Sequence, residues 1–145
     1  MTEAIKDQVP IADDLFLLHG DKAALLGSFC ADCDEHFFPR QESCTKCPSQ
    51  EMQDVELGDR GTLWSWTIQC FPPKPPYRAD KPAEEFQPFA VGYVELACGL
   101  KVEAKLLKDD TREFSIGDRM QLAVVPFFLD DADREVLSFA FKQTD

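Results

Sequence analysis

Four cysteines in two Cys-x-x-Cys pairs constrain this chain more than any other feature of its sequence. The pairs are Cys30 with Cys33 and Cys44 with Cys47, and ten residues separate them. This spacing lets two short knuckles face each other and hold one metal ion in a tetrahedral thiolate cage. Zn²⁺ suits such a cage because four thiolates leave no open coordination position. Iron in a rubredoxin-like site and a redox-active dithiol are the alternatives.

A closed cage of this kind does not activate water, and it folds a segment that is too small to fold alone. We therefore expect the four cysteines to organise the architecture rather than to perform chemistry. The two further cysteines, Cys70 and Cys98, are interpreted as small buried hydrophobic residues, because neither has a basic neighbour in sequence. His36 lies between the knuckles and is expected to face solvent or to support the cage.

The charge of the chain argues against nucleic acid, which zinc ribbons often bind. The 145 residues carry a net charge of −12. Residues 1–60 hold 5 basic and 13 acidic side chains, and residues 61–145 hold 10 and 14. Nucleic-acid affinity depends on Lys/Arg patches that contact phosphates, and the sequence shows no such cluster in the cysteine-rich half.

No stretch of 18 or more apolar residues predicts a membrane span, so we expect no membrane partner. The N-terminal residues lack the basic and apolar regions of a secretory signal. Together with the paired Cys-x-x-Cys spacing, this favours a reducing, cytoplasmic location and a metal rather than disulfides.

The sequence predicts three segments. Residues 1–27 are expected to form a leader and a short helix, capped by Asp13 or Asp14, with Leu15, Leu18 and Leu25 on its inner side. Residues 28–58 are expected to form the ribbon, in which 36–40 adds a short strand and 48–59 is a polar linker. Residues 59–145 are expected to form a barrel.

The last segment has the alternating pattern of a mainly β protein. Five stretches rich in β-branched and aromatic residues predict strands at 62–68, 89–96, 100–107, 119–126 and 136–141. The second and third flank a turn and predict a hairpin. Residues 71–88 contain a proline cluster that excludes a central strand, so this stretch is expected to be a long functional or disordered loop. Five strands without a long helix favour a small barrel of the OB type.

This order of features resembles a known family, the rubredoxin-like zinc ribbon joined to an OB-fold that accompanies thiolase-type enzymes and was long catalogued as a domain of unknown function. The resemblance covers roughly residues 14–142 and rests on the ordered set rather than on one motif. In addition to the four cysteines, the matching residues are Phe38-Pro39-Arg40, residues 61–67, Pro75-Pro76-Tyr77, residues 89–96 and Ile116-Gly117-Asp118. Asp34 and Pro48 stand where many members have glycine behind each knuckle.

The resemblance implies an accessory subunit of a heteromeric acyl-CoA enzyme, with no activity expected of the chain alone. Members of the family accompany thiolases, thiolase-like aldolases or hydroxymethylglutaryl-CoA synthases, including the benzoylsuccinyl-CoA thiolase of anaerobic toluene breakdown. The catalytic cysteine and histidine belong to the thiolase-fold partner, so no catalytic residue is expected here. A coenzyme A thioester is the implied shared substrate of the complex.

Two groups of residues are candidates for contacts with a ligand or a partner subunit. Four cations are proposed to meet the phosphates of coenzyme A, in three cases from the proline loop: Arg40, Lys74, Arg78 and Lys81. Trp64 and Trp66 are expected on one strand face, where they form a packed or subunit-facing surface, or a stacking platform for an aromatic group. A nucleic-acid-binding ribbon and a rubredoxin-like electron carrier remain the rival functions; the first predicts salt-dependent binding and the second a red, iron-containing protein.

Overall fold

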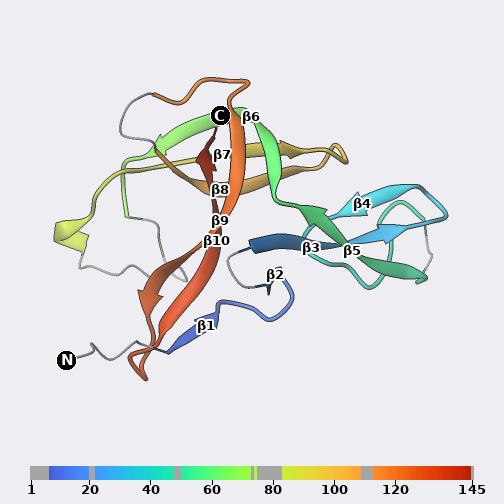
Figure 1. Ribbon diagram of the computed structural model, residues 1–145, viewed down its shortest axis with the longest axis horizontal. Coiled ribbons are helices and arrows are strands. Elements are labelled where there is room, and N and C mark those ends of the chain that lie inside the picture. The colour runs from blue at the N-terminus through green and yellow to red at the C-terminus, as the bar shows by residue number, and fades with distance from the viewer. Residues whose placement is uncertain are drawn as a thin grey trace.

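The computed structural model describes residues 7–19, 22–47, 50–72, 74, 83–108 and 113–144, and within them every extended element is a β-strand. Figure 1 shows two lobes, a barrel and a smaller ribbon that projects from it. The barrel strands are β6 (Arg60–Gln69), β7 (Phe89–Leu96), β8 (Lys101–Leu107), β9 (Arg119–Leu129) and β10 (Glu135–Gln143). No helix in the described ranges is long and apolar enough to cross a membrane.

The five barrel strands close on themselves. β7 pairs antiparallel with β6 and β8, β8 runs parallel to β10, and β9 pairs antiparallel with both β10 and β6. This pairing closes the barrel and confirms the OB-type fold predicted from the sequence. Inward positions alternate with outward ones, and Leu63, Val94, Met120 and Phe141 fill the centre with almost no exposed surface.

The ribbon is a second sheet built around β3 (Lys22–Cys30), which pairs antiparallel with β2 (Phe16–His19), β4 (Glu35–Phe37) and β5 (Met52–Gly58). A short strand, β1 (Gln8–Pro10), adds to the barrel in parallel with β10. The strand predicted between the knuckles is confirmed as β4.

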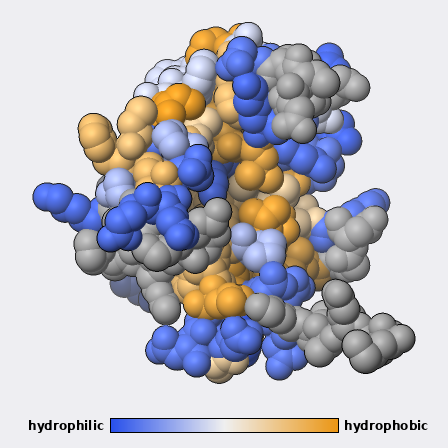
Figure 2. Space-filling model, turned by 90° about the vertical axis from the view of Figure 1, so that its left-hand side faces the viewer, coloured by the Kyte–Doolittle hydropathy of each residue, from blue (hydrophilic) through white to orange (hydrophobic). Residues whose placement is uncertain are grey.

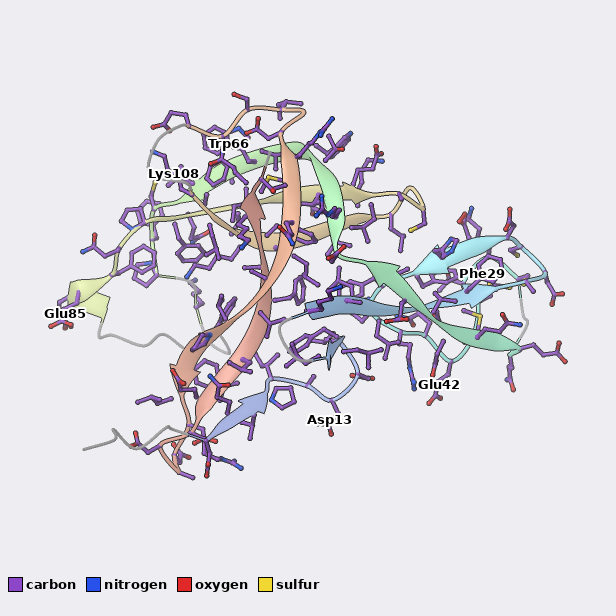
Figure 3. The ribbon with its side chains drawn as sticks, viewed as in Figure 1. Asp13, Phe29, Glu42, Trp66, Glu85 and Lys108 are labelled. Carbon is purple, nitrogen blue, oxygen red and sulfur yellow. The ribbon has the colours of Figure 1, made fainter. Side chains whose placement is uncertain are left out.

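The helix predicted before the ribbon is wrong. Asp13 and Asp14 lie in a turn, and β2 follows it as a strand (Figure 3). Pairing with β3 places Phe16 opposite Leu25 and buries both side chains in the barrel core. Leu18, expected on the inner side of the helix, is 47% exposed. The only helical turn described is η1, a 3₁₀ turn at Ala83–Glu85 in the long loop.

The polar linker predicted at 48–59 is also wrong, because most of it forms β5. The strand is polar because Gln53, Asp54 and Glu56 face solvent, while Val55 and Leu57 pack against the core. A strand with only one buried face needs only alternate apolar residues. Within 71–88, the described residues form no strand, which agrees with the proline pattern.

The ribbon and the barrel share one core. Leu25 and Leu57 of the ribbon sheet belong to the same buried cluster as Leu63 and Phe141 of the barrel. The ring of Phe38, just after β4, meets Phe139 of β10 edge-on, with centroids 5.5 Å apart. The barrel lobe therefore supports the ribbon directly.

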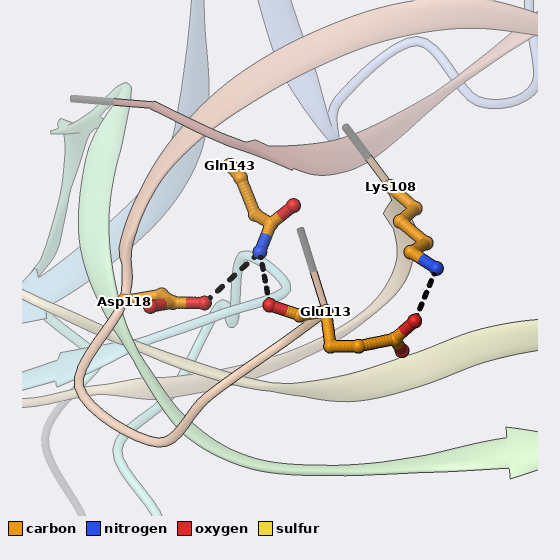
Figure 4. A network of polar contacts seen from close by, with 4 residues as sticks. All are labelled: Lys108, Glu113, Asp118 and Gln143. Carbon is orange, nitrogen blue, oxygen red and sulfur yellow. Dashed lines mark hydrogen bonds and ion pairs between the residues drawn. The ribbon is translucent and has the colours of Figure 1, made fainter. Parts of the chain in front are cut away.

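A polar network anchors the turn that leads into β9 (Figure 4). The buried side chain of Gln143 donates two hydrogen bonds of 3.0 Å, one to the Glu113 carbonyl oxygen and one to the Asp118 carboxylate. The same carboxylate accepts a 2.8 Å hydrogen bond from the Ser115 N–H. An ion pair of 2.7 Å joins Lys108 to Glu113 beside it. These contacts fix the position at which β9 enters the barrel.

The β9–β10 hairpin is closed by Asp130. Its carboxylate accepts hydrogen bonds from the backbone N–H groups of Arg134, at 2.8 Å, and Ala132, at 3.0 Å, and from the Arg134 guanidinium, at 2.8 Å. The Arg134 backbone N–H, followed by these other donors, holds the pKa of Asp130 below its ordinary value, although partial burial acts in the opposite direction.

We predict that Asp130→Ala lowers the thermal midpoint at neutral pH. Because the folded pKa is depressed, the stabilisation is present above the ordinary Asp pKa and disappears as pH falls through the lower folded value. Thermal melts of both proteins over a pH series should therefore converge at acidic pH. Glu84→Ala, an exposed carboxylate in η1, is the control and should leave the midpoint unchanged. If the thermal midpoint of Asp130→Ala stayed below that of the wild-type protein by the same amount at acidic pH, this account would be contradicted.

Candidate metal centre

The four cysteines of the two knuckles come together at the far end of the ribbon. Cys30 ends β3, Cys33 lies in the turn before β4, and Cys44 and Cys47 lie in the loop between β4 and β5. The loop is tied back to the sheet in two places. Arg40 forms an ion pair of 2.9 Å with Asp54 of β5, and the Gln41 N–H donates a 3.0 Å hydrogen bond to the buried Ser28 hydroxyl. These contacts place the second knuckle opposite the first.

The geometry of the thiols fits a tetrahedral metal ion. The four sulfur atoms lie within 4.8 Å of one another, and the Cys30 and Cys47 sulfurs are 3.7 Å apart. Metal–sulfur bonds of about 2.3 Å in a regular tetrahedron require sulfur–sulfur separations of about 3.8 Å. A disulfide would instead need about 2.0 Å. Two of the thiols, Cys30 and Cys44, are buried, so the centre is closed on its inner side.

The thiols disturb one another electrostatically. Burial raises the pKa of Cys30. A hydrogen bond with Cys47, together with burial, raises the pKa of Cys33 to about 12. Burial would also raise the pKa of Cys44, but the N–H groups of Cys47 and Lys46 lower it to about 7; the Lys46 N–H lies 3.3 Å from this sulfur. Four thiolates this close need a cation, since a dication removes the repulsion that keeps them protonated.

The first knuckle accommodates aspartate directly after its second cysteine, where the resemblance led us to expect glycine. Asp34 has a φ of 55°, in the left-handed region that glycine adopts without strain. Aspartate is among the few other residues that adopt this conformation readily. The knuckle therefore keeps its turn without glycine. Pro48, at the corresponding position of the second knuckle, lies outside the described residues.

The cations proposed from the sequence to contact coenzyme A are not brought together within the described part of the chain. Arg40 is engaged with Asp54, and Lys74 is exposed just after β6. Arg78 and Lys81 lie outside the described residues.

Two interpretations of single residues need correction. Cys70 and Cys98 are exposed rather than buried, because one follows the end of β6 and the other lies in the β7–β8 turn. Trp64 and Trp66 do not share a face. A bulge between Leu63 and Ser65 shifts the register, so Trp64 is 52% exposed while Trp66 packs on Phe114 and the core (Figure 3).

Barrel closure also creates an apolar hollow that the sequence pattern did not reveal. It has a volume of about 470 Å³ and is lined by Phe89, Phe127 and Phe139, with the buried Ser138 at its wall. The Lys105 ammonium lies 4.8 Å from the Phe89 ring centre and 5.4 Å from that of Phe127. Figure 2, which faces the side where β7 begins, shows hydrophobic side chains between hydrophilic ones. The lining residues come from all five barrel strands, so only the pairing of these strands brings them together.

Comparison with known proteins supports the architecture. The rubredoxin-like zinc ribbon domain of ChsH2 matches residues 22–53, and the C-terminal OB-fold domain of ChsH2 matches residues 54–125. A DUF35 domain-containing scaffold protein of Methanocaldococcus jannaschii is 23% identical over 123 residues, which cover 84% of this chain and 82% of that protein. A scaffold protein of the same description from Methanothermobacter thermautotrophicus is 25% identical over 122 residues, 81% of this chain and 84% of the relative.

A solved structure has the same fold. A chain of the Ltp2-ChsH2(DUF35) aldolase superposes with a TM-score of 0.60 at 24% identity, over 83% of this chain and 84% of that chain. The two ChsH2 domains match consecutive segments that together span residues 22–125. The order of ribbon and barrel in this chain is the order of these two domains. The chain therefore belongs to the ChsH2 family of proteins, in which a rubredoxin-like zinc ribbon precedes an OB-fold domain.

Proposed function

We propose that this chain is a zinc-binding, non-catalytic accessory subunit of a heteromeric thiolase-type acyl-CoA enzyme, which it helps to assemble. The observation that carries the proposal is the match of both family domains in their order, 22–53 and 54–125. The similar solved chain belongs to a protein described as an aldolase, and the similar archaeal proteins are described as scaffolds. An accessory subunit with a scaffolding role accounts for both descriptions.

The chemistry of the chain supports a non-catalytic role. Its one cluster of metal-ligating side chains in the described ranges is a four-cysteine cage, and a cage with four protein ligands leaves no position for substrate. Cys70 and Cys98 lie outside this cage, as single exposed thiols after β6 and in the β7–β8 turn. Carbon–carbon bond cleavage or formation through an acyl-cysteine would use a nucleophile of the partner.

The exposed aromatic pair on β6 and β7 is our candidate for the docking surface. The Trp64 and Tyr93 rings meet edge-on with centroids 6.2 Å apart, and the Lys101 ammonium lies 4.8 Å from the Trp64 ring centre. A tryptophan held in place by its neighbours loses little side-chain entropy on binding, and such residues dominate interface energies.

Trp64→Ala tests this docking surface. We expect it to weaken binding to the catalytic subunit by about 30-fold or more, as for an interface hot spot, without loss of the fold. Calorimetric titration with the purified partner measures the affinity, and circular dichroism measures the fold. Leu129→Ala removes another exposed apolar side chain, at the end of β9, and should bind normally. Equal affinities for the two variants would exclude the Trp64 surface.

We further propose that this chain contacts the coenzyme A thioester directly. Lys74 is exposed at the start of the long loop, and Arg78 and Lys81 follow it in sequence. Their cationic side chains suit phosphate groups at the edge of the partner's site. Arg40 would have to exchange its ion pair with Asp54 for such a contact, so it supports the proposal less than the loop cations.

A further inference from the structure

About half of the lysines and arginines described in this acidic protein are paired with a carboxylate, and four of the others gather on one surface. Five form ion pairs with carboxylates, and Lys105 lies between two phenylalanine rings. Apart from Lys74, the described cations for which the structure shows no such contact are Lys22, Arg60, Arg119 and Lys142. We call these four residues the basic face.

Strand register places three of them on the same side of the barrel wall. Arg60 of β6 lies opposite Gln121 of β9, which in turn lies opposite Lys142 of β10. Arg119 lies opposite Thr62, two residues along the same strands. Residues in register point to the same face of a sheet, and the alternate positions, such as Met120, are buried in the core. The three cations therefore point outward together.

The spacing of these cations suits one ligand with more than one negative group. With strands about 4.8 Å apart, the α-carbons of Arg60 and Lys142 are separated by about 10 Å. Arg60 and Arg119 are diagonal neighbours, about 7–8 Å apart. Arginine and lysine side chains are long enough to converge on a common anion from such distances. Guanidinium groups bind phosphate oxygens through two parallel hydrogen bonds.

Two hollows flank Arg60 and give the surface a concave shape. One, of about 660 Å³, is lined by Lys22, Arg60, Gln121 and Lys142. The other, of about 510 Å³, is lined by Arg60, Thr62 and Arg119. Among the described residues that line them, each hollow also has one carboxylate. Asp59 lies in the first, and Glu95 lies in the second, where it is paired with Lys101 at 3.6 Å. Positive charge therefore exceeds negative charge around Arg60.

We propose that the basic face binds a small anion carrying two or more phosphate groups. Arg60 and Arg119 are the principal ligands, and Lys142 and Lys22 add positive charge beside them. Volumes of a few hundred Å³ are typical of small-molecule sites. The site goes beyond the proposed function, because it is built from this chain alone and needs neither the metal nor a catalytic partner. It is also distinct from the loop cations assigned above to coenzyme A.

The test is a titration of the full chain with inorganic pyrophosphate at constant ionic strength, followed by NMR of the arginine Nε–H groups. We expect saturable shifts of Arg60 and Arg119. Arg60→Gln with Arg119→Gln should weaken binding by about tenfold or more per arginine, since each loses a charge-assisted hydrogen bond. Lys108→Gln removes one positive charge from an exposed ion pair elsewhere and should bind pyrophosphate normally. Shifts that do not saturate, or equal weakening in the control, would overturn the proposal.

The source of the phosphate is distinguished by a second titration, with coenzyme A, on the pyrophosphate-loaded protein. Displacement of pyrophosphate, with the same arginine shifts, would identify the coenzyme as the natural source. Retention of pyrophosphate would assign the site to a different phosphorylated compound. Both results support a phosphate site on the basic face. The proposed accessory role is tested separately by partner binding, so failure of either claim leaves the other standing.

Discussion

Replacing Cys44 with serine is expected to abolish metal binding and unfold the knuckle loop while the barrel remains folded. Cys44 is buried, and its sulfur is one of four that lie within 4.8 Å of one another. Structural zinc contributes about 10–16 kcal/mol of binding free energy in small zinc domains, and most of this depends on the complete set of thiolates. The barrel strands pair among themselves, so their fold does not require the ion.

The measurements are metal content by mass spectrometry and hydrogen exchange along the chain. We expect about one zinc per wild-type chain and almost none in Cys44→Ser after treatment with a chelator. Exchange should increase in residues 31–47 and stay slow in β7 and β8. Cys70→Ser is the matched control, because Cys70 is an exposed cysteine outside the cage. A Cys44→Ser protein that keeps its full metal content would rule out the four-cysteine centre.

The second large effect is expected from Leu25→Ala, which tests whether ribbon and barrel form one cooperative unit. Leu25 lies in β3 of the ribbon sheet, has no exposed surface, and packs in the same cluster as Leu63 and Phe141 of the barrel. Truncation of a buried leucine costs about 2–5 kcal/mol, because apolar contacts are lost and a cavity remains. We expect this loss in the free energy of unfolding of the whole protein, in one transition.

Denaturant unfolding, followed separately by tryptophan fluorescence and by backbone circular dichroism, measures this effect. The tryptophans report the barrel, since both lie in β6. Leu18→Ala is the control, an exposed leucine in the neighbouring strand β2, for which we expect a change within about 0.5 kcal/mol. Two separate transitions, with the barrel transition unaffected by Leu25→Ala, would show that the ribbon is an independent unit.

The structure could be predicted from the sequence where it depends on local residue pattern and chemistry. The spacing of Cys30, Cys33, Cys44 and Cys47 predicted the cage, because two knuckles with this separation have few other ways to fold. Alternation of apolar residues predicted the five barrel strands, since inward and outward positions must differ at every second residue. The hairpin of β7 and β8 followed from a turn between two such patterns, and the pairing of the two strands confirms it.

The structure could not be predicted from the sequence where a segment's conformation depends on pairing with a strand distant in sequence. Residues 13–19 have leucines at a spacing compatible with a helix, and only pairing with β3 makes them a strand. Polar β5 has a weak pattern of its own and is stabilised by the same strand. The bulge at Trp64 reverses the face of Trp66, and no local signal marks it. The basic face likewise arises from register among β6, β9 and β10.

The central claim is that this metal-binding chain works as one subunit of a thiolase-type enzyme. Its most direct test is native mass spectrometry of the assembly purified from the source organism through a tag on this chain. The account predicts a stoichiometric complex with a thiolase-fold subunit that carries the acyl-accepting cysteine, with one zinc bound to this chain. Recovery of this chain alone, or with no thiolase-fold protein, would contradict the account.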